Sequence, residues 1–269
     1  MSVRIRLDVS YDGTDFSGWA VQPGRRTVAG ELLAVLERLF GSVAGLTVAG
    51  RTDAGVHATG QVCHVDVEEE RWAVLESALV RKLAGLLPPD VRVLAAGAVP
   101  PEFDARFSAL ARRYEYRVTD APFGAEPLRR RDTLAWPRPL DLALLNEAAA
   151  GLVGEHDFAA FCRRKEHAST IRAVSRMEWR RDADGTVVAT VAADAFCWSM
   201  VRSLVGAQLV AGDGRRATSW PGSLLTRTVR ADEVVVAPAH GLTLVEVTYP
   251  GDAEALSARA ELTRRRRDL

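Results

Sequence analysis

The segment 50–57 carries the residues of this chain that are best suited to chemistry. It reads Gly-Arg-Thr-Asp-Ala-Gly-Val-His, so that two glycines enclose Arg51 and Asp53. Glycine adopts backbone conformations that are closed to other residues, and an aspartate with an ordinary pKa of about 3.9 is ionised at neutral pH. Such a carboxylate can act as a nucleophile. A turn with a surface salt bridge fits the same local pattern, so both interpretations stay open at this point.

Periodic apolar residues indicate which elements position this loop. Residues 3–11 alternate between apolar and polar, which predicts a half-buried strand. Apolar residues at helical spacing from Leu32 predict an amphipathic helix that ends at Phe40, before Gly41. Short strands near 46–49 and over 62–67 enclose the loop, so we expect it to join two strands. A helix over 72–87 and a strand over 91–99 complete the order β-α-β-β-α-β.

The second half of the chain repeats this order. The patterns predict a strand over 113–118, a helix over 141–152, a hairpin of strands 171–179 and 186–193, a helix over 197–211 and a strand over 242–249. We therefore expect an α+β fold of two split β-α-β halves of the ferredoxin or RRM-like kind. The halves should share a largely antiparallel sheet with helices on one side and a central cleft. The boundary near Ala105 gives an N-terminal half over 1–105 and a C-terminal half over 106–269.

The charge of the chain is balanced, but its cations are unusual. The formal net charge at pH 7 is zero, and Lys82 and Lys165 are the only lysines among 35 basic residues, which leaves 33 arginines. Arginine presents a planar donor fork suited to phosphate, although a codon bias explains the count equally well. The basic residues cluster at 129–131, 163–165, 215–216 and 264–267. Segregated basic loops allow a neutral protein to bind RNA, while each cluster alone also fits a solvated face.

The composition is that of an ordinary globular protein. Hydrophobic residues make up 48% and charged residues 26%, and neither a long apolar run nor a leader is recognisable, so we expect a cytoplasmic protein without a membrane partner. Cys63, Cys162 and Cys197 match no paired metal-ligand spacing, and we expect them to be small buried apolar residues. His57 and His64 flank a strand, where hydrogen bonding is the expected role. We predict no metal site.

A second motif suggests a nucleotide cofactor but has the wrong context. Residues 212–217 fit the pattern G-x-G-x-x-A, and Asp232 has the spacing of a ribose-binding acid. The preceding segment is helix-like rather than strand-like, and Trp220-Pro221 interrupts the helix that should follow. The signatures of common serine hydrolases, zinc proteases, zinc deaminases and P-loop enzymes are missing from the sequence. We therefore expect no cofactor.

The loop at 50–58, followed by Gln61, resembles the active-site motif of the tRNA pseudouridine synthase A family. Further segments resemble that family in the expected order across nearly the whole chain: 11–14 with Phe16 and Gly18-Trp19, 111–116, Phe196 with 200–202 and 205–206, and 237–239 with 241–242. The chain departs from the family pattern at five positions: Ala20, Ala29, Trp198, Ser199 and Ser203. These departures concern RNA contacts and substrate choice rather than the reaction.

The resemblance implies an isomerase that converts uridine to pseudouridine at positions 38, 39 and 40 in the anticodon stem-loop of tRNA. Asp53 is the implied nucleophile, attacking either the base or the sugar. Tyr114, which by its strand pattern alone is a core aromatic, would stack on the flipped uracil and take part in proton removal. Arg202 lies in an apolar helical run where an unpaired charge is costly, and the resemblance makes Asp53 its partner. Arg202 reaching solvent from a helix edge is the alternative.

The resemblance also implies three substrate-binding residues beside Tyr114. Arg51 would hold the RNA open by filling the vacated stack or gripping a phosphate, Leu242 would line the base pocket, and His57 closes the motif. A homodimer that jointly holds one tRNA is implied as well, with no metal or cofactor. Two other functions fit the residues without the resemblance. They are a non-catalytic RNA-binding module and, less well, a nicotinamide-dependent oxidoreductase.

Overall fold

The computed structural model describes residues 1–163 and 169–265. Contacts divide the chain into two compact units: Met1–Leu110 with Leu244–Leu269, and Ala111–Thr243. The predicted division at Ala105 therefore differs from the observed one in two respects, since the boundary lies after Leu110 and the C-terminal segment joins the first unit. Two parts of the predicted basic clusters, 164–165 and 266–267, lie outside the described residues.

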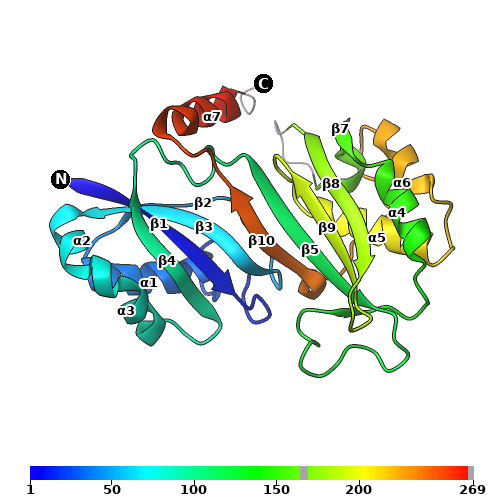
Figure 1. Ribbon diagram of the computed structural model, residues 1–269, viewed down its shortest axis with the longest axis horizontal. Helices are drawn as coiled ribbons and strands as arrows, with labels where there is room; N and C mark the ends of the chain where they lie inside the picture. Colours follow the sequence, from blue (N-terminus) through cyan, green and yellow to red (C-terminus); the bar gives the residue numbers. More distant parts are fainter. Residues whose placement is uncertain (164–168, 266–269) are drawn as a thin grey trace. The chain divides into compact units, whose positions relative to one another are not determined.

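The first unit is built on an antiparallel sheet (Figure 1). β1 (Ser2–Tyr11) lies between β3 (His57–Glu68) and β4 (Val91–Val99), and β2 (Ala44–Val48) pairs with β3. β10 (Leu242–Thr248) follows β3 in the strand order. The expected alternation in β1 is confirmed, because its apolar residues are buried at every second position from Ile5 to Tyr11.

Helix α1 (Val28–Phe40) begins and ends where local chemistry predicts. The Thr27 side chain accepts the backbone N–H of Gly30 at 3.3 Å, which caps the first turn. Gly41 has a φ of 84° and donates its N–H to the Glu37 carbonyl at 2.8 Å, which ends the helix. The predicted end at Phe40 is confirmed. The buried stripe of α1 faces the unit's core.

The prediction of a single helix over 72–87 is wrong in one respect. The segment forms α2 (Glu69–Leu75), a 3-10 turn (Glu76–Ala78) and α3 (Leu79–Leu86). Its buried residues keep helical spacing across the interruption, so periodicity could not reveal the break. The C-terminal α7 (Ala253–Arg265) packs on the segment before Leu110, where Ser108 Oγ donates to the Leu256 carbonyl at 3.1 Å.

The strands of the second unit follow the order β5-β9-β8-β7 within the ten-stranded sheet of the protein. β5 (Ala111–Thr119) pairs with β9 (Val187–Ala193), β9 with β8 (Ile171–Arg181), and β8 with β7 (Gly154–Asp157), all antiparallel. The short β6 (Leu134–Ala135) runs parallel to β5. The predicted hairpin of β8 and β9 is confirmed, and Gly185 turns it with a φ of 83°.

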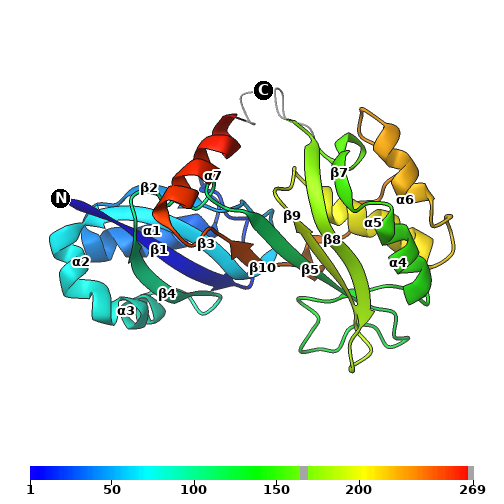
Figure 2. The same ribbon diagram turned by 45° about the horizontal axis from the view of Figure 1, so that its top comes forward.

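The helices of the second unit show which structure the G-x-G motif at 212–217 forms. α4 (Leu142–Ala150) contacts β8 and α5 (Met200–Gly212), and α6 (Trp220–Ser223) is short (Figure 2). Gly212 ends α5, and a Cβ there would lie 2.5 Å from a methyl carbon of Leu145. The motif is therefore a close helix contact and a helix end, not the strand-to-helix turn of a dinucleotide fold. The α+β class is confirmed.

Candidate active site

Asp53 lies in the loop that joins β2 to β3, as predicted. Ala49 donates its N–H to the Val62 carbonyl at 2.8 Å, which closes the base of the loop. At the tip, Val56 donates its N–H to the Asp53 carbonyl at 3.1 Å, and Gly55 takes a φ of 77°. Asp53 itself is half-buried and Arg51 is exposed. The backbone that carries the carboxylate is therefore held at both ends of a tight turn.

The segment after β1 packs directly against this loop. Trp19 donates its N–H to the Thr52 carbonyl at 3.1 Å. Gly18 has a φ of 93°, and a Cβ there would lie 2.8 Å from the same carbonyl oxygen. A Cβ at Gly13 would lie 2.0 Å from the Val56 carbonyl oxygen. Both glycines are required because the two backbones touch at these points.

A buried hydrogen-bond network supports the loop from below. The Tyr11 hydroxyl and Thr52 Oγ1 are 2.7 Å apart, and Gln61 Nε2 donates to the Tyr11 oxygen at 3.2 Å. The same amide donates to the Gly50 carbonyl at 2.9 Å. Gln61 is fully buried, and its contacts join β3 to β1 and to the start of the loop. A fully satisfied polar network of this kind selects one arrangement of the backbone.

His57 is placed behind the loop rather than on its surface. Its side chain is almost completely buried, and its Nδ1 accepts the Gly13 N–H at 3.0 Å. Asp12 Oδ1 lies 3.2 Å from the same Nδ1. This geometry suits a residue that positions the loop.

Replacing Gly13 by alanine tests the contact between the two segments. The added Cβ must displace the Val56 carbonyl, so we expect Gly13→Ala to lower the free energy of unfolding by about 1–3 kcal/mol and to reduce turnover. The measurement is denaturant unfolding together with an activity assay. Gly85→Ala in α3 is the control, because the added Cβ meets no atom within 4 Å outside its own helix. Equal unfolding curves for the two variants would refute the close contact.

The other predicted site residues belong to the second unit. Tyr114 on β5 is 7% exposed and meets the Phe196 ring edge-to-face, with 5.3 Å between centroids. Leu242 is buried at the start of β10. Tyr114, Tyr116 and Val118 are buried at alternate positions of the strand, so the core position expected for Tyr114 from its strand pattern is confirmed. An aromatic held by an edge-on neighbour has a fixed ring plane, which suits it to stacking.

Arg202 is half-buried in the first turn of α5 and bridges to the segment before β10. Its Nε donates to the Ala237 carbonyl at 2.7 Å, and the Ala237 N–H returns a bond to the Arg202 carbonyl at 3.0 Å. Tyr116 donates its hydroxyl to the Pro238 carbonyl at 2.8 Å. Burial raises the pKa of Tyr116, and the nearby charge of Arg202 opposes this increase. The predicted Arg202 and Tyr114 thus lie on neighbouring elements of one unit.

One of the three cysteines meets the expectation and two do not. Cys63 is buried and free, and burial raises the pKa of its thiol, so the expected apolar role fits it. Cys162 and Cys197, also expected to be small buried apolar residues, instead form a disulfide with 5.7 Å between their Cα atoms. They are 35 residues apart in sequence, and a contact of that range is set by packing rather than spacing. Sequence reasoning had no signal for this pair.

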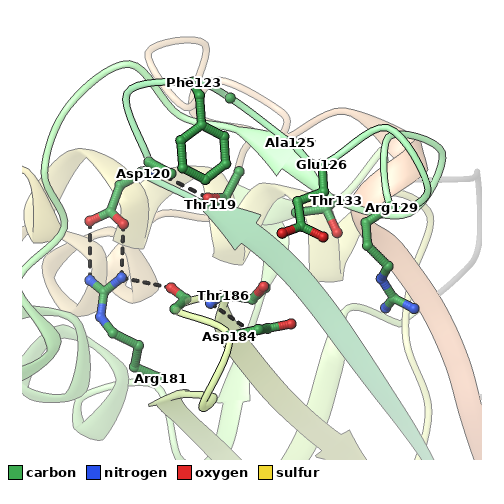
Figure 3. A pocket seen from close by; sticks show the side chains of 13 residues that line it. Thr119, Asp120, Phe123, Ala125, Glu126, Arg129, Thr133, Arg181, Asp184 and Thr186 are labelled. Carbon is green, nitrogen blue, oxygen red and sulfur yellow. Dashed lines mark hydrogen bonds and ion pairs between the residues drawn. The ribbon is translucent and has the colours of Figure 1, made fainter.

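A small cavity elsewhere in the second unit contains none of the predicted site residues. It has a volume of about 170 Å³ and lies between the segment after β5 and the β8–β9 turn (Figure 3). Its Asp120 carboxylate binds both terminal nitrogens of Arg181, at 2.8 and 3.1 Å, and also accepts the Leu140 N–H. Arg181 thereby lowers the pKa of Asp120. The Asp120 carboxylate and the Arg181 guanidinium therefore hold neighbouring loops together, and these contacts already use their hydrogen-bonding atoms.

Residues 1–163 and 169–265 contain no group of three or more histidine, cysteine, aspartate or glutamate side chains arranged to hold a metal ion. Over the same residues, no helix combines the length and the apolar character needed to cross a membrane.

Comparison with known proteins identifies the class and then the family. The motif loop and its neighbours lie in a region, residues 9–108 and 148–250, that matches the family model described as tRNA pseudouridine synthase. Proteins named tRNA pseudouridine synthase A are 60% identical in Frankia casuarinae, over 97% of this chain and 94% of that protein, and 57% identical in Streptomyces griseus, over 99% and 95%. The one from Mycobacterium leprae is 50% identical, over 97% and 94%. The chain is a pseudouridine synthase, an isomerase. It belongs to the tRNA pseudouridine synthase family.

Proposed function

We propose that this enzyme isomerises uridines at positions 38, 39 and 40 of the tRNA anticodon stem-loop, with Asp53 as the covalent catalyst. The observation that carries the proposal is the rigid mounting of Asp53, whose loop is fixed by the Tyr11–Thr52–Gln61 network and by two glycine contacts. A nucleophile held in one geometry lowers the entropic part of the barrier.

The reaction requires few groups. The bond from the ribose to N1 of uracil breaks, a bond from the ribose to C5 forms, and the proton on C5 is lost while N1 gains one. Nothing is oxidised or reduced, so no redox cofactor is needed. In the proposal Asp53 carries the intermediate, Arg202 is its ion-pair partner, and Tyr114 stacks on the uracil and assists the loss of the C5 proton.

Arg51 and Leu242 complete the proposed site. Arg51 is exposed beside the nucleophile and is free to enter the RNA stack or contact a phosphate. Leu242 supplies an apolar wall for the base. Extruding a nucleotide costs a few kcal/mol, which favours weakly paired targets near a loop. His57 holds the catalytic loop in place in this scheme, through its contact with Gly13.

The test of the proposal is to map pseudouridine in tRNA that has been exposed to the purified protein. Conversion at positions 38–40 supports it, and conversion only at other sites would overturn the assignment of the target. The proposal also includes a cytoplasmic homodimer that holds one tRNA with two subunits. Titration of tRNA into the protein should then saturate at one tRNA per two chains.

Binding of tRNA should depend steeply on salt. The arginine-rich surface neutralises backbone phosphates and releases counterions, so the logarithm of the association constant should fall with the logarithm of salt by about 0.7 to 0.9 per phosphate contacted. Filter binding or fluorescence anisotropy at several salt concentrations measures this slope. A flat response would contradict an extended RNA footprint.

A further inference from the structure

A depression on the second unit is lined by three arginines and a hydroxyl. Its volume is about 490 Å³, and its lining residues are Arg163, Ser199, Arg202, Arg230 and Val236. No carboxylate is among these lining residues within 1–163 and 169–265. Several like charges around a concave surface create a positive potential that attracts an anion. The depression therefore has the electrostatics of an anion site.

Arg230 has a donor that the described chain does not use. Its Nη1 is buried, and it has no hydrogen-bond partner among the described residues. The backbone beside it is held firmly, because Ala231 donates its N–H to the Ala160 carbonyl at 3.0 Å. A buried donor without an acceptor is costly, and native proteins rarely keep one without a reason. An acceptor from a ligand would satisfy it.

Arg163, which lines this depression, is held over the ring of a neighbouring aromatic residue. Its guanidinium lies 4.6 Å from the centroid of the Trp198 ring, and its N–H donates to the Trp198 carbonyl at 3.0 Å. The adjacent disulfide of Cys162 and Cys197 joins the same two segments. Stacking fixes the plane of a guanidinium and leaves its edge for bidentate hydrogen bonds, for which phosphate is a suitable acceptor.

Ser199 and Arg202 connect the depression to the catalytic groups. Ser199 precedes α5 with a φ of 64°, a conformation that is uncommon for serine, and its side chain makes no capping hydrogen bond. The amino terminus of a helix carries partial positive charge, which adds to the field of the arginines. Arg202 is shared between this depression and the proposed active site. An anion bound here would lie next to the reacting nucleotide.

We propose that this depression binds one phosphodiester of the RNA backbone beside the uridine that is isomerised. The inference rests on the proposed function and adds a specific binding site to it. Arg163 and Arg230 are the residues that would grip the phosphate oxygens, and Ser199 would donate its hydroxyl. Anchoring the backbone at this point fixes the register of the strand and so determines which uridine reaches Asp53.

The test uses anticodon stem-loop RNAs that each carry one uncharged methylphosphonate linkage, with cytidine at the target positions to prevent turnover. Arg163→Gln and Arg230→Met should each weaken binding of the unmodified RNA by about 10- to 100-fold, as expected for hydrogen bonds to a charged group. At the linkage that occupies the depression, a methylphosphonate should weaken RNA binding by the wild-type protein about as much as either arginine substitution does. The same methylphosphonate should weaken RNA binding by the two variants little further. Arg230→Met should also reduce the salt slope by about 0.7 to 0.9.

Controls separate the possible failures. Arg176→Gln removes an exposed arginine of β8 that pairs with Glu178, and it should bind like wild type at every linkage. Thermal unfolding of Arg230→Met checks that this variant folds. Arg163→Gln provides a second measurement, because Arg163 is exposed and its replacement should leave folding intact. The inference would be overturned if the losses of affinity from the arginine substitution and from the methylphosphonate were additive at every linkage. Competition by inorganic phosphate, with no linkage at which the two losses are coupled, would overturn it as well. Failure of the proposed function would appear separately, as wild-type protein that forms no pseudouridine.

Discussion

Asp53→Asn is expected to abolish pseudouridine formation while tRNA binding and folding are retained. The substitution keeps the size and shape of the side chain but removes the negative charge and the nucleophilic oxygen. Loss of a covalent nucleophile typically lowers kcat by about 10⁴-fold or more. Because the loop is held through the backbone and through Tyr11, Thr52 and Gln61, the variant should keep the wild-type loop.

The measurement is release of tritium from tRNA labelled at C5 of uridine, since this hydrogen is lost when C5 joins the ribose. Asp15→Asn makes the same chemical change at an exposed position in the segment that packs against the loop, and it should turn over like the parent. Turnover by Asp53→Asn at the parent rate would refute the covalent role. It would favour the alternative of an RNA-binding module without chemistry at this residue.

Arg202→Met is expected to lower turnover by about 100- to 1000-fold and to change tRNA affinity by less than about 10-fold. This range corresponds to about 2.7–4 kcal/mol at 1.36 kcal/mol per tenfold in rate, which is comparable with what it typically costs to remove one member of a buried ion pair. In the proposal, Asp53 loses the positive charge that orients it. The variant also loses the bond from Arg202 Nε to the Ala237 carbonyl, so thermal unfolding must accompany the kinetics.

A double-mutant cycle tests the pairing of Arg202 with Asp53 directly. If the two charges interact, Arg202→Met should destabilise the Asp53→Asn protein less than it destabilises the wild type, with a coupling of at least about 0.5 kcal/mol. Additive effects on the free energy of unfolding would exclude the ion pair. Equal losses in turnover and affinity for Arg202→Met would assign the residue to phosphate binding instead.

Local patterns predicted most of the elements because their signals lie within a few residues. The alternation from Ile5 to Tyr11 and the glycine stop after Phe40 were sufficient for β1 and α1. The interruption of the second helix at Glu76–Ala78 left the apolar spacing intact and was therefore invisible. The Cys162–Cys197 disulfide was missed because spacing rules address neighbours, and this pair joins distant segments.

The sequence by itself determined that Asp53 lies between two glycines, in a loop between two strands. Turn chemistry and alternation are local properties, so they can be recognised without the tertiary structure. Only the tertiary structure decided that Gly13 and Gly18 of another segment must touch this loop, since that contact depends on how β1 packs beside β3. It also decided that Arg163 and Arg230 line one depression. Their positions follow from long-range hydrogen bonds, such as that of Ala231 with Ala160, which no spacing in the sequence encodes.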